Sequence, residues 1–359
     1  MTACLITTNY PPVGGGVSRY NYGLVHAVFP RIVLGGWDDG DSPPSGEGFV
    51  AKIKQLIWAQ RIVARMPRST LLLVSQPHLG LGLLMTGRPF VQFVHGGEWE
   101  NYPAGRALFR LFLAYPQKLV FNSVATMERL KCSRRGRFDL VLKPGLSEIT
   151  PVKPASGRRS VGSLQKNPLI RVLAVSRLSR RKGHRRLIAG VERCHAAGLN
   201  IELTVVGSGE LQDEIGQFIE GKTFVTLKSG LSDAELRLAY DRADIFALLP
   251  EQIKGGEAWE GFGIVYLEAA ARGLPILATD TGGVREATCQ EGALLLSEAC
   301  TETDIAESIH YLSTSPIVRL RMSEANLSWA AENTWSARAE VIGEVFATQI
   351  GRGLSGRHR

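Results

Sequence analysis

The stretch that decides the fold runs from Trp259 to Glu286 and reads WEGFGIVYLEAAARGLPILATDTGGVRE. A Gly-Phe-Gly turn leads into a helical pattern, followed by Pro275, a short apolar run and a Gly-Gly pair. This order of turn, helix and strand is typical of a parallel α/β sheet. Two glutamates, Glu260 and Glu268, lie eight positions apart across the turn, so the stretch also offers two candidate site carboxylates.

The same alternation of strands and helices extends through the second half of the chain, and beyond Glu302 the pattern is helical throughout. Repeated strand and helix units predict a doubly wound parallel sheet. The expected strands are 169–175, 201–206, 223–227, 244–249 and 275–279, and the expected helices are 184–197, 210–219, 232–241 and 263–272.

The first half of the chain shows a second alternation of the same kind. It begins with an apolar run, a glycine loop at Gly14–Gly16 and a helical pattern, which predicts a strand, a turn and a helix. The expected strands are 3–8, 32–34, 71–75, 89–94 and 118–122, and the expected helices are 17–29, 49–66, 79–85 and 104–115.

The length of 359 residues favours two domains, since one domain usually holds roughly 100 to 200 residues. Residues 147–167 are rich in Pro, Ser, Gly and Arg and are interpreted as the linker. We therefore expect Rossmann-like domains over 1–150 and 168–330. A helix over 335–350 is long enough to cross back onto the first domain.

The composition is that of a soluble globular enzyme, with 44% hydrophobic and 21% charged residues. The five cysteines are scattered and no histidine cluster accompanies them, which predicts no metal centre and a reducing, cytoplasmic compartment. Apolar runs fall short of the ~18 to 20 residues that span a bilayer, and the first residues lack the pattern of a signal peptide.

The charge is distributed unevenly. Residues 1–150 hold 17 Lys and Arg against 9 Asp and Glu, whereas residues 151–359 hold 25 of each. The excess predicts attraction to an anionic membrane surface, through the helix at 104–115 and the basic run 131–137; an ordinary basic surface is the alternative. The peripheral site would be the inner face of the plasma membrane. No recognised nucleic-acid motif accompanies the charge, so a nucleic-acid partner is not expected.

Two features of the first half are candidates for ligand binding. His95 and two glycines directly follow an expected strand, and open parallel sheets bind ligands at the carboxyl ends of their strands. The glycine loop at Gly15 and Gly16 could bring backbone N–H groups close to a phosphate. Asp39 and Asp41 form a D-x-D pattern, which we interpret as a solvated turn rather than a metal site.

In the second half, Arg177 follows an expected strand and Lys182 precedes the glycine that turns the chain into a helix. Two cations in this position predict a diphosphate site, with a solvated basic loop as the alternative. Gly207 lies in another turn from strand to helix.

Three roles remain open for Glu260 and Glu268 on spacing alone. They could hold neighbouring parts of one polyol, act as general acid and base as in glycoside hydrolysis, or be charges at a helix N-terminus. The backbone N–H groups of Phe262, Gly263 and Ile264 would add hydrogen-bond donors beside them.

Taken in order, these motifs resemble the retaining glycosyltransferases of family 4, which have the GT-B fold of two Rossmann-like domains facing a central cleft. The resemblance covers nearly the whole chain. It is carried by Gly14-Gly15-Gly16, His95-Gly96, R-L-x-x-x-K-G at Arg177–Gly183, G-S-G-E at Gly207, E-G-F-G-x-x-x-x-E at Glu260–Glu268 and T-G-G at Thr281–Gly283.

The resemblance implies a role for each matching position. Arg177 and Lys182 would hold the diphosphate of a nucleotide-sugar donor, and Glu268 would bind the ribose hydroxyls. Glu260 and the backbone amides of Phe262, Gly263 and Ile264 would hold hydroxyls of the donor sugar, and Gly207 would also belong to the donor site. His95 would lie near the sugar, and Gly15 and Gly16 near the phosphates.

We therefore predict a retaining transferase that moves a hexose from a UDP- or GDP-sugar to a lipid-linked or saccharide acceptor in cell-envelope polysaccharide or glycolipid synthesis. It would need no metal or other cofactor, since Arg and Lys supply the charge. The sequence leaves open whether Glu260 is a nucleophile. The alternatives are a GT-B nucleotide-sugar epimerase, a phosphorylase and a non-catalytic nucleotide-sugar-binding protein.

Overall fold

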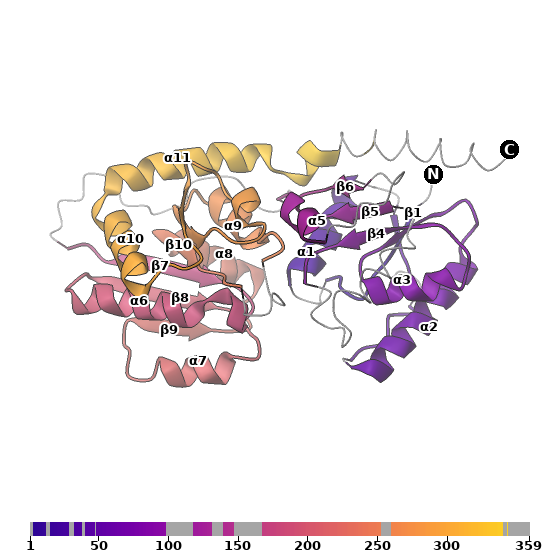
Figure 1. Ribbon diagram of the computed structural model, residues 1–359, viewed down its shortest axis with the longest axis horizontal. Coiled ribbons are helices and arrows are strands. Elements are labelled where there is room, and N and C mark those ends of the chain that lie inside the picture. Colours follow the sequence, from indigo (N-terminus) through magenta and orange to yellow (C-terminus); the bar gives the residue numbers. More distant parts are fainter. Residues whose placement is uncertain are drawn as a thin grey trace. The chain divides into compact units, whose positions relative to one another are not determined.

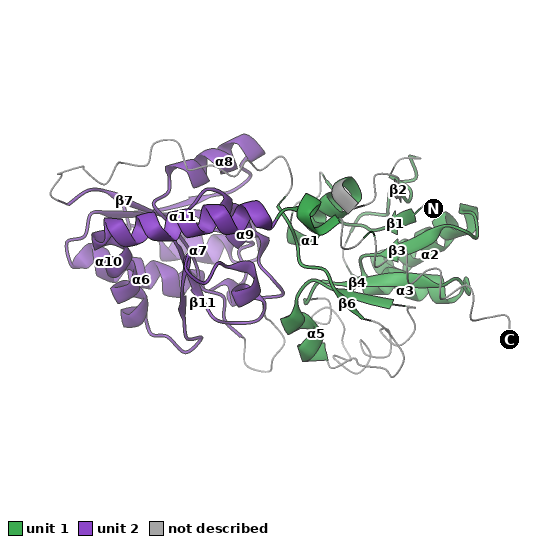
Figure 2. Cartoon of the chain, turned by 90° about the horizontal axis from the view of Figure 1, so that it is seen from above, with its two compact units in different colours: residues 1–148, 334–359 green, residues 149–333 purple. Residues whose placement is uncertain are grey.

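The computed structural model describes residues 3–11, 15–28, 32–37, 40–46, 48–97, 118–130, 139–146, 167–252, 260–339 and 343. The chain divides into two compact units, one formed by Met1–Glu148 with Thr334–Arg359 and the other by Ile149–Asn333 (Figure 2). Each unit contains a parallel sheet of six strands among the described residues. The predicted fold class of two doubly wound α/β domains is therefore confirmed.

Unit 1 is built on a sheet with the strand order β2-β1-β3-β4-β5-β6. Strands β1, β4, β5 and β6 are labelled in Figure 1. Its strands are almost uniformly apolar, as expected where helices cover both faces of a parallel sheet. The strands are β1 (Ala3–Ile6), β2 (Ile32–Leu34), β3 (Leu71–Val74), β4 (Phe90–Val94), β5 (Lys118–Phe121) and β6 (Leu140–Val141). The helices are α1 (Gly16–Gly23), continued by a π-helical turn (Leu24–Val28), α2 (Phe49–Arg65), α3 (Pro77–Leu84) and α5 (Val124–Leu130).

Helices α2 and α3 cover one face of this sheet. Cys4 of β1 and Leu72 of β3 pack against Trp58 and Ile62 of α2 in one buried cluster. Because side chains alternate along a strand, this pattern assigns every second residue to the α2 side. The indole of Trp58 also donates a hydrogen bond to the carbonyl of Asp41 (2.7 Å), which ties the preceding loop to the core.

The chain returns to unit 1 at Thr334. Leu146 and Thr334 form a parallel bridge, and the backbone N–H of Trp335 donates to the carbonyl of Leu146 (3.0 Å). The buried ring of Trp335 meets the ring of Tyr20 edge to face at 5.1 Å. A Cβ on Gly23 would lie 1.9 Å from the Trp335 ring, so only glycine fits there.

Unit 2 has the strand order β12-β11-β10-β7-β8-β9, again parallel throughout. The strands are β7 (Ile170–Val175), β8 (Ile201–Val206), β9 (Val225–Lys228), β10 (Ile245–Leu248), β11 (Ile276–Thr279) and β12 (Ala293–Leu296). The helices are α6 (His184–Ala196), α7 (Gln212–Phe218), α8 (Asp233–Arg242), α9 (Ile264–Ala271), α10 (Glu302–Thr314) and α11 (Pro316–Glu332).

The two faces of strand β7 differ in what covers them. Val172 and Ala174 belong to a buried cluster with Leu187 of α6 and Ile305 of α10. Helices α6 and α10 lie side by side (Figure 1). The alternate residue Leu173 is directed to the other face, where helix α8 packs. This division leaves the carboxyl edge of the sheet open to the loops that follow each strand.

The structure differs from the sequence-based expectations in a few elements. It adds α5, β6 and β12, which were not expected, and it shortens the helix expected at 210–219. Of the helix expected at 335–350, residues 335–339 are helical and the rest lies outside the described residues. The described carboxylate of Asp41 pairs with Arg65 (3.0 Å), as suits a solvated turn.

Several other expected features lie outside the described residues. These are Gly14, Asp39, the helix at 104–115 with the basic run 131–137, and the linker up to residue 166.

Replacing Trp335 with alanine is predicted to destabilise unit 1. Its buried ring packs edge to face against Tyr20, and truncating a buried Trp lowers the free energy of unfolding by about 3–5 kcal/mol. Urea unfolding, followed by circular dichroism, would show an early transition in Trp335→Ala. The control Tyr311→Ala, at a half-exposed residue of α10, should change stability by less than about 0.5 kcal/mol. Equal effects of the two changes on stability would contradict the prediction that the buried ring of Trp335 stabilises unit 1.

Candidate functional site

The candidate site of unit 2 is formed by loops that leave the carboxyl edge of its sheet. Lys182 lies in a short 3-10 turn (Arg180–Lys182) after β7, and Glu260 lies in the loop between β10 and α9. Strands β7 and β10 are neighbours, so their following loops meet although these residues are 78 positions apart. Ligands of open parallel sheets bind at this edge.

Glu260 is held in a buried ion cluster. The Nζ of Lys182 donates to Oε2 of Glu260, and Nη1 of Arg181 donates to the same oxygen at 3.1 Å. The side chains of Lys182 and Glu260 are 8% and 7% exposed. Burial by itself would raise the pKa of Glu260, but Lys182 and Arg181 outweigh it and hold the pKa below its usual value. Glu260 is therefore a carboxylate whose charge is already balanced.

The T-G-G turn after β11 supports this carboxylate through the backbone. The N–H of Gly283 donates to the carbonyl of Glu260 (2.9 Å). A Cβ on Gly282 would lie 2.1 Å from that carbonyl oxygen, and one on Gly283 would lie 2.3 Å from the carbonyl oxygen of Gly261. Both glycines are needed because the backbone of residues 260–261 lies directly against the turn.

The turn into α9 leaves its first backbone N–H groups available. Gly263 occupies the N-cap with φ +99°, and no described side chain caps this end of the helix. The ring of Tyr266 lies where a Cβ on Gly263 would fall, 2.6 Å away. Phe262 is buried while Gly263 and Ile264 are partly exposed, so backbone donors at the start of α9 border the surface beside Glu260.

Glu268 lies one turn into α9 and is nearly buried. Its Oε2 accepts a hydrogen bond from the hydroxyl of Tyr240 on α8 (2.9 Å). The ring of Tyr240 stacks on Phe246 of β10 with ring centroids 6.0 Å apart, which fixes the hydroxyl. Tyr240 was not among the residues predicted from the sequence, because an aromatic residue in a helical pattern is usually a core residue.

The remaining residues predicted for this site are placed differently. Arg177 is exposed at the end of β7, while Gly207 is partly buried in its loop. A Cβ on Gly207 would lie 1.9 Å from the carbonyl oxygen of Ser176, so this glycine is required by close contact between two loops. Arg181 was not predicted as a site residue, because it is one of several adjacent cations in a basic loop.

His184 is a further buried group of the β7 loop. Its Nε2 lies 2.8 Å from Oγ of Ser176. Burial, with the nearby charge of Lys182, lowers the pKa of His184 to about 4, so its ring is neutral at neutral pH.

In unit 1, His95 follows β4 and joins a polar network at the carboxyl edge of the sheet. Its Nε2 lies 3.1 Å from Oγ of Ser75, and its ring meets Tyr20 edge to face at 4.8 Å. Burial lowers the pKa of His95 to about 3, so the imidazole is neutral at neutral pH. Ser75 donates onward to Asn21 (3.0 Å), whose amide donates to Thr7 (3.0 Å).

The glycine loop before α1 behaves differently from the packed glycines of unit 2. Gly15 has φ +114°, a conformation that side chains rarely adopt, and forms the N-cap of α1. A Cβ on Gly15 or Gly16 would meet no atom of the described residues within 4 Å, so packing against this part of the chain does not require these glycines.

Removing the Lys182 charge is predicted to raise the pKa of Glu260, since burial then has one less cation against it. In the wild type the pKa is lowered, so this carboxylate stabilises the fold above the unfolded pKa of ~4.3, and this stability is lost as pH falls through the folded pKa. In Lys182→Met, the loss in free energy of unfolding relative to the wild type should be largest at neutral pH and should become smaller on acidification. It should be at most about 3–5 kcal/mol, because Arg181 remains beside Glu260.

Urea midpoints at several pH values between neutral and mildly acidic would measure this effect. The double variant Lys182→Met with Glu260→Gln should recover much of the lost stability, because no uncompensated charge remains buried. A stability difference between wild type and Lys182→Met that is the same at all pH values would overturn the assignment.

The fold of the whole chain matches solved glycosyltransferase structures. HepE of Anabaena in complex with UDP and glucose superposes with a TM-score of 0.73 at 17% identity, covering 96% of this chain and 99% of that one. The sucrose-phosphate synthase of Thermosynechococcus elongatus superposes with a TM-score of 0.74 at 16% identity, covering 98% and 99%. These neighbours establish the GT-B fold.

Curated relatives are more similar in sequence. A GDP-mannose-dependent monoacylated alpha-(1-6)-phosphatidylinositol monomannoside mannosyltransferase of Corynebacterium glutamicum is 29% identical over 71% of this chain and 69% of its own length. A GDP-mannose-dependent alpha-(1-6)-phosphatidylinositol monomannoside mannosyltransferase of Mycolicibacterium smegmatis is 28% identical over 72% and 70%. Residues 160–329 match the family of glycosyl transferases group 1. The chain therefore carries a group 1 glycosyl transferase domain and is a hexosyltransferase with the GT-B fold.

Proposed function

We propose that this protein transfers mannose from GDP-mannose to a phosphatidylinositol-linked glycolipid of the cell envelope. The observation that carries the proposal is the buried cluster of Lys182, Arg181 and Glu260 beside the open start of α9. Two cations and one carboxylate leave a net positive charge, which suits a diphosphate. The choice of GDP-mannose and of the acceptor rests on the names of the two mannosyltransferase relatives.

The roles within the donor site follow from the groups that the loops present. Lys182, with Arg177, would hold the diphosphate and stabilise its growing charge as the bond to the sugar breaks. Glu260 and the backbone donors of the α9 turn would hold sugar hydroxyls, and Glu268 would accept hydrogen bonds from the ribose. In this proposal Arg181 keeps Glu260 ionised and oriented when Lys182 turns to the phosphate.

Three assignments stay predictions on this proposal. His95 would contact the donor sugar as a neutral hydrogen-bonding group, and Gly15 and Gly16 would receive phosphate oxygens. Gly207 is explained by its contact with Ser176, so a direct role in donor binding is not needed. The absence of a metal requirement is also kept as a proposal, since the cations could supply the charge that a metal would otherwise provide.

Transfer from labelled GDP-mannose into lipid extracts tests the donor and the site together. Lys182→Met should lower kcat/KM by about 100-fold or more, because a group that stabilises transition-state charge is lost. Glu268→Gln should lower it by about 10- to 100-fold, as expected for losing hydrogen bonds to a charged group. Chelation of divalent metals should leave the rate unchanged.

The matched control is Lys222→Met, which breaks another Lys–Glu pair, with Glu192, on the surface of unit 2. It should transfer at the wild-type rate. Undiminished transfer in both site variants would refute the site roles. Transfer from UDP-sugars but not from GDP-mannose would refute the donor.

We also propose that helix α2 brings the protein to an anionic membrane surface, where a lipid-linked acceptor would lie. Phe49, Val50, Ile53 and Ile57 are 79%, 65%, 42% and 48% exposed on this helix. They recur at helical spacing and form an apolar ridge. A helix with such a ridge and a basic polar face is suited to lie at a lipid interface.

The charges of α2 match an anionic surface. The helix contains Lys52, Lys54, Arg61 and Arg65 and has no acidic residue. Each cation close to an anionic bilayer contributes about 1 kcal/mol of attraction. Among the described residues, no helix combines the length and hydrophobicity needed to cross a membrane, so α2 would lie on the surface.

Removing apolar surface from α2 is predicted to weaken vesicle binding. The double variant Ile53→Ser, Ile57→Ser should lower partitioning to phosphatidylglycerol vesicles by about tenfold or more, since burying one isoleucine contributes about 1.5–3 kcal/mol. Ile317→Ser, at an equally exposed isoleucine of α11, is the control and should bind like the wild type. Binding that is insensitive to salt, or equal on neutral phosphatidylcholine vesicles, would refute the electrostatic part of the proposal.

A further inference from the structure

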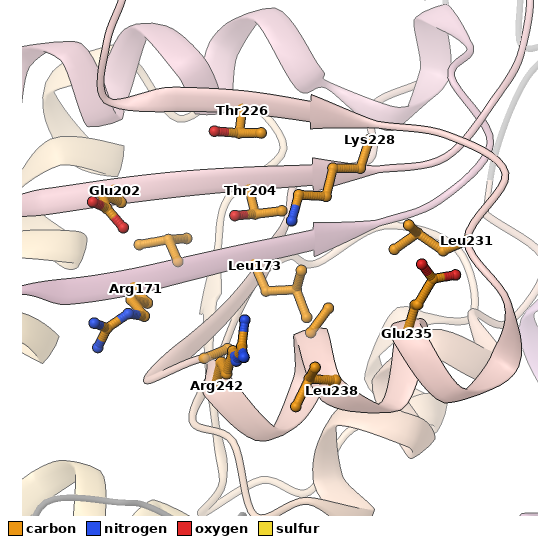
Figure 3. A pocket seen from close by; sticks show the side chains of 13 residues that line it. Arg171, Leu173, Glu202, Thr204, Thr226, Lys228, Leu231, Glu235, Leu238 and Arg242 are labelled. Carbon is orange, nitrogen blue, oxygen red and sulfur yellow. The ribbon is translucent and has the colours of Figure 1, made fainter.

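A second concave site lies on the sheet face of unit 2 that helix α8 only partly covers. Strands β7, β8 and β9 form its floor and α8 forms one wall, enclosing a cavity of about 430 Å³ (Figure 3). This volume falls within the range of small-molecule sites, about 300–1,000 Å³. The residues of the ion cluster and Glu268 are not among those that line it.

The floor of this pocket combines an apolar centre with two hydroxyls. Leu173 of β7 is in register with Thr204 of β8, which is in register with Thr226 of β9. Neighbouring strands are about 4.8 Å apart, so the two threonines form adjacent donors on one row. Leu173 is buried beneath the pocket, whereas Thr226 is exposed.

Two cations point into the pocket from opposite sides. Figure 3 shows the amine of Lys228, at the end of β9, directed toward the threonine row, and the guanidinium of Arg242, at the end of α8, directed toward Leu173. Within the described part of the chain, neither side chain makes a hydrogen bond or ion pair within salt-bridge distance. The charge of Lys228 acts on the nearby carboxylate of Glu235 without a direct ion pair. Two cations that converge on hydroxyl groups favour an anion.

The two carboxylates of the pocket lie toward its ends. Glu235 is engaged in the capping box of α8, where Ser232 donates to it through its backbone N–H (2.8 Å) and hydroxyl (2.7 Å). Glu202 is in register with Arg171, one row away from the threonines. With Arg171, the lining holds three cations against these two carboxylates, which leaves a net charge of +1.

We propose that this pocket binds a phosphorylated sugar at a site separate from the donor. Lys228, Arg242 and the hydroxyls of Thr204 and Thr226 would hold the phosphate, because each of them can donate a hydrogen bond to a phosphate oxygen. Glu202, with Arg171, would face the hydroxyls of the sugar ring, since a carboxylate accepts hydrogen bonds that a phosphate cannot donate.

Calorimetric titration of the full chain with mannose 6-phosphate tests the proposal, with inorganic phosphate and mannose as probes of the two halves of the ligand. Mannose 6-phosphate should bind, inorganic phosphate should bind more weakly, and mannose should not bind detectably up to about 10 mM. Lys228→Met and Arg242→Met should each weaken mannose 6-phosphate binding by about tenfold or more, as a charged hydrogen bond is lost.

Arg237→Met is the matched control, since Arg237 is exposed on α8 but does not line the pocket. It should bind mannose 6-phosphate within about twofold of the wild type. Saturating GDP should leave the affinity within about threefold, because the sites are separate. Absence of mannose 6-phosphate binding, binding unaffected by both pocket variants, or binding abolished by GDP would each overturn the proposal. Loss of transferase activity with GDP-mannose would bear on the proposed reaction and not on this site.

Discussion

The site of this enzyme depends on one buried carboxylate and the two cations that neutralise it. Taking a charge out of water costs several kcal/mol, so Glu260 can be buried only if Lys182 and Arg181 reach it. They reach it because β7 and β10 are neighbours in the sheet. The strand order is therefore a condition for the chemistry: separating these strands would leave an uncompensated charge beneath the start of α9.

Three glycines of unit 2, Gly183, Gly207 and Gly282, allow the loops at the carboxyl edge of the sheet to lie this close together. A Cβ on Gly183 would lie 2.0 Å from the carbonyl oxygen of Leu249, and one on Gly282 would lie 2.1 Å from that of Glu260. Gly207 meets Ser176 in the same way. Each contact joins loops that follow neighbouring strands, β7 with β10, β11 with β10, and β8 with β7. These glycines pack the carboxyl edge into one rigid surface. Gly15 and Gly16 have no such neighbour among the described residues, and Gly15 is required instead by its positive φ.

The sequence predicted the elements well where period and length agreed. It placed β8 at 201–206 and Glu268 one turn into its helix, as observed, because apolar runs and helical periodicity are local signals. It missed β12, whose apolar run ALLL has no β-branched residue to distinguish a strand from a helix segment. The pairing of Lys182 with Glu260 could not be predicted from the sequence either. Residues 78 positions apart meet only through the strand order, which a single sequence does not encode locally.

The residues that sequence reasoning set aside share a physical reason for being missed. Arg181 is one of several adjacent cations, and it differs from the others by the direction of its side chain, which reaches Glu260. Tyr240 looks like a core aromatic, yet its hydroxyl holds Glu268. The exposed ridge of α2 is equally hidden, because apolar spacing in a helix indicates a buried face unless burial is known. In each case the deciding quantity is exposure or orientation, which follows from packing.

Helix α8 links the two proposed sites of unit 2 through its contacts with α9. Tyr240 donates to Glu268, and the next residue, Asp241, pairs with Arg272 at the end of α9 (3.4 Å). The position of Glu268 is thus set by two helices rather than one. Arg242, which follows directly, lines the pocket on the sheet face. Arg242 and Tyr240 lie on the same turn of α8, so the two proposed sites are neighbours that share one helix but no residue. By linkage, any coupling between them must be reciprocal.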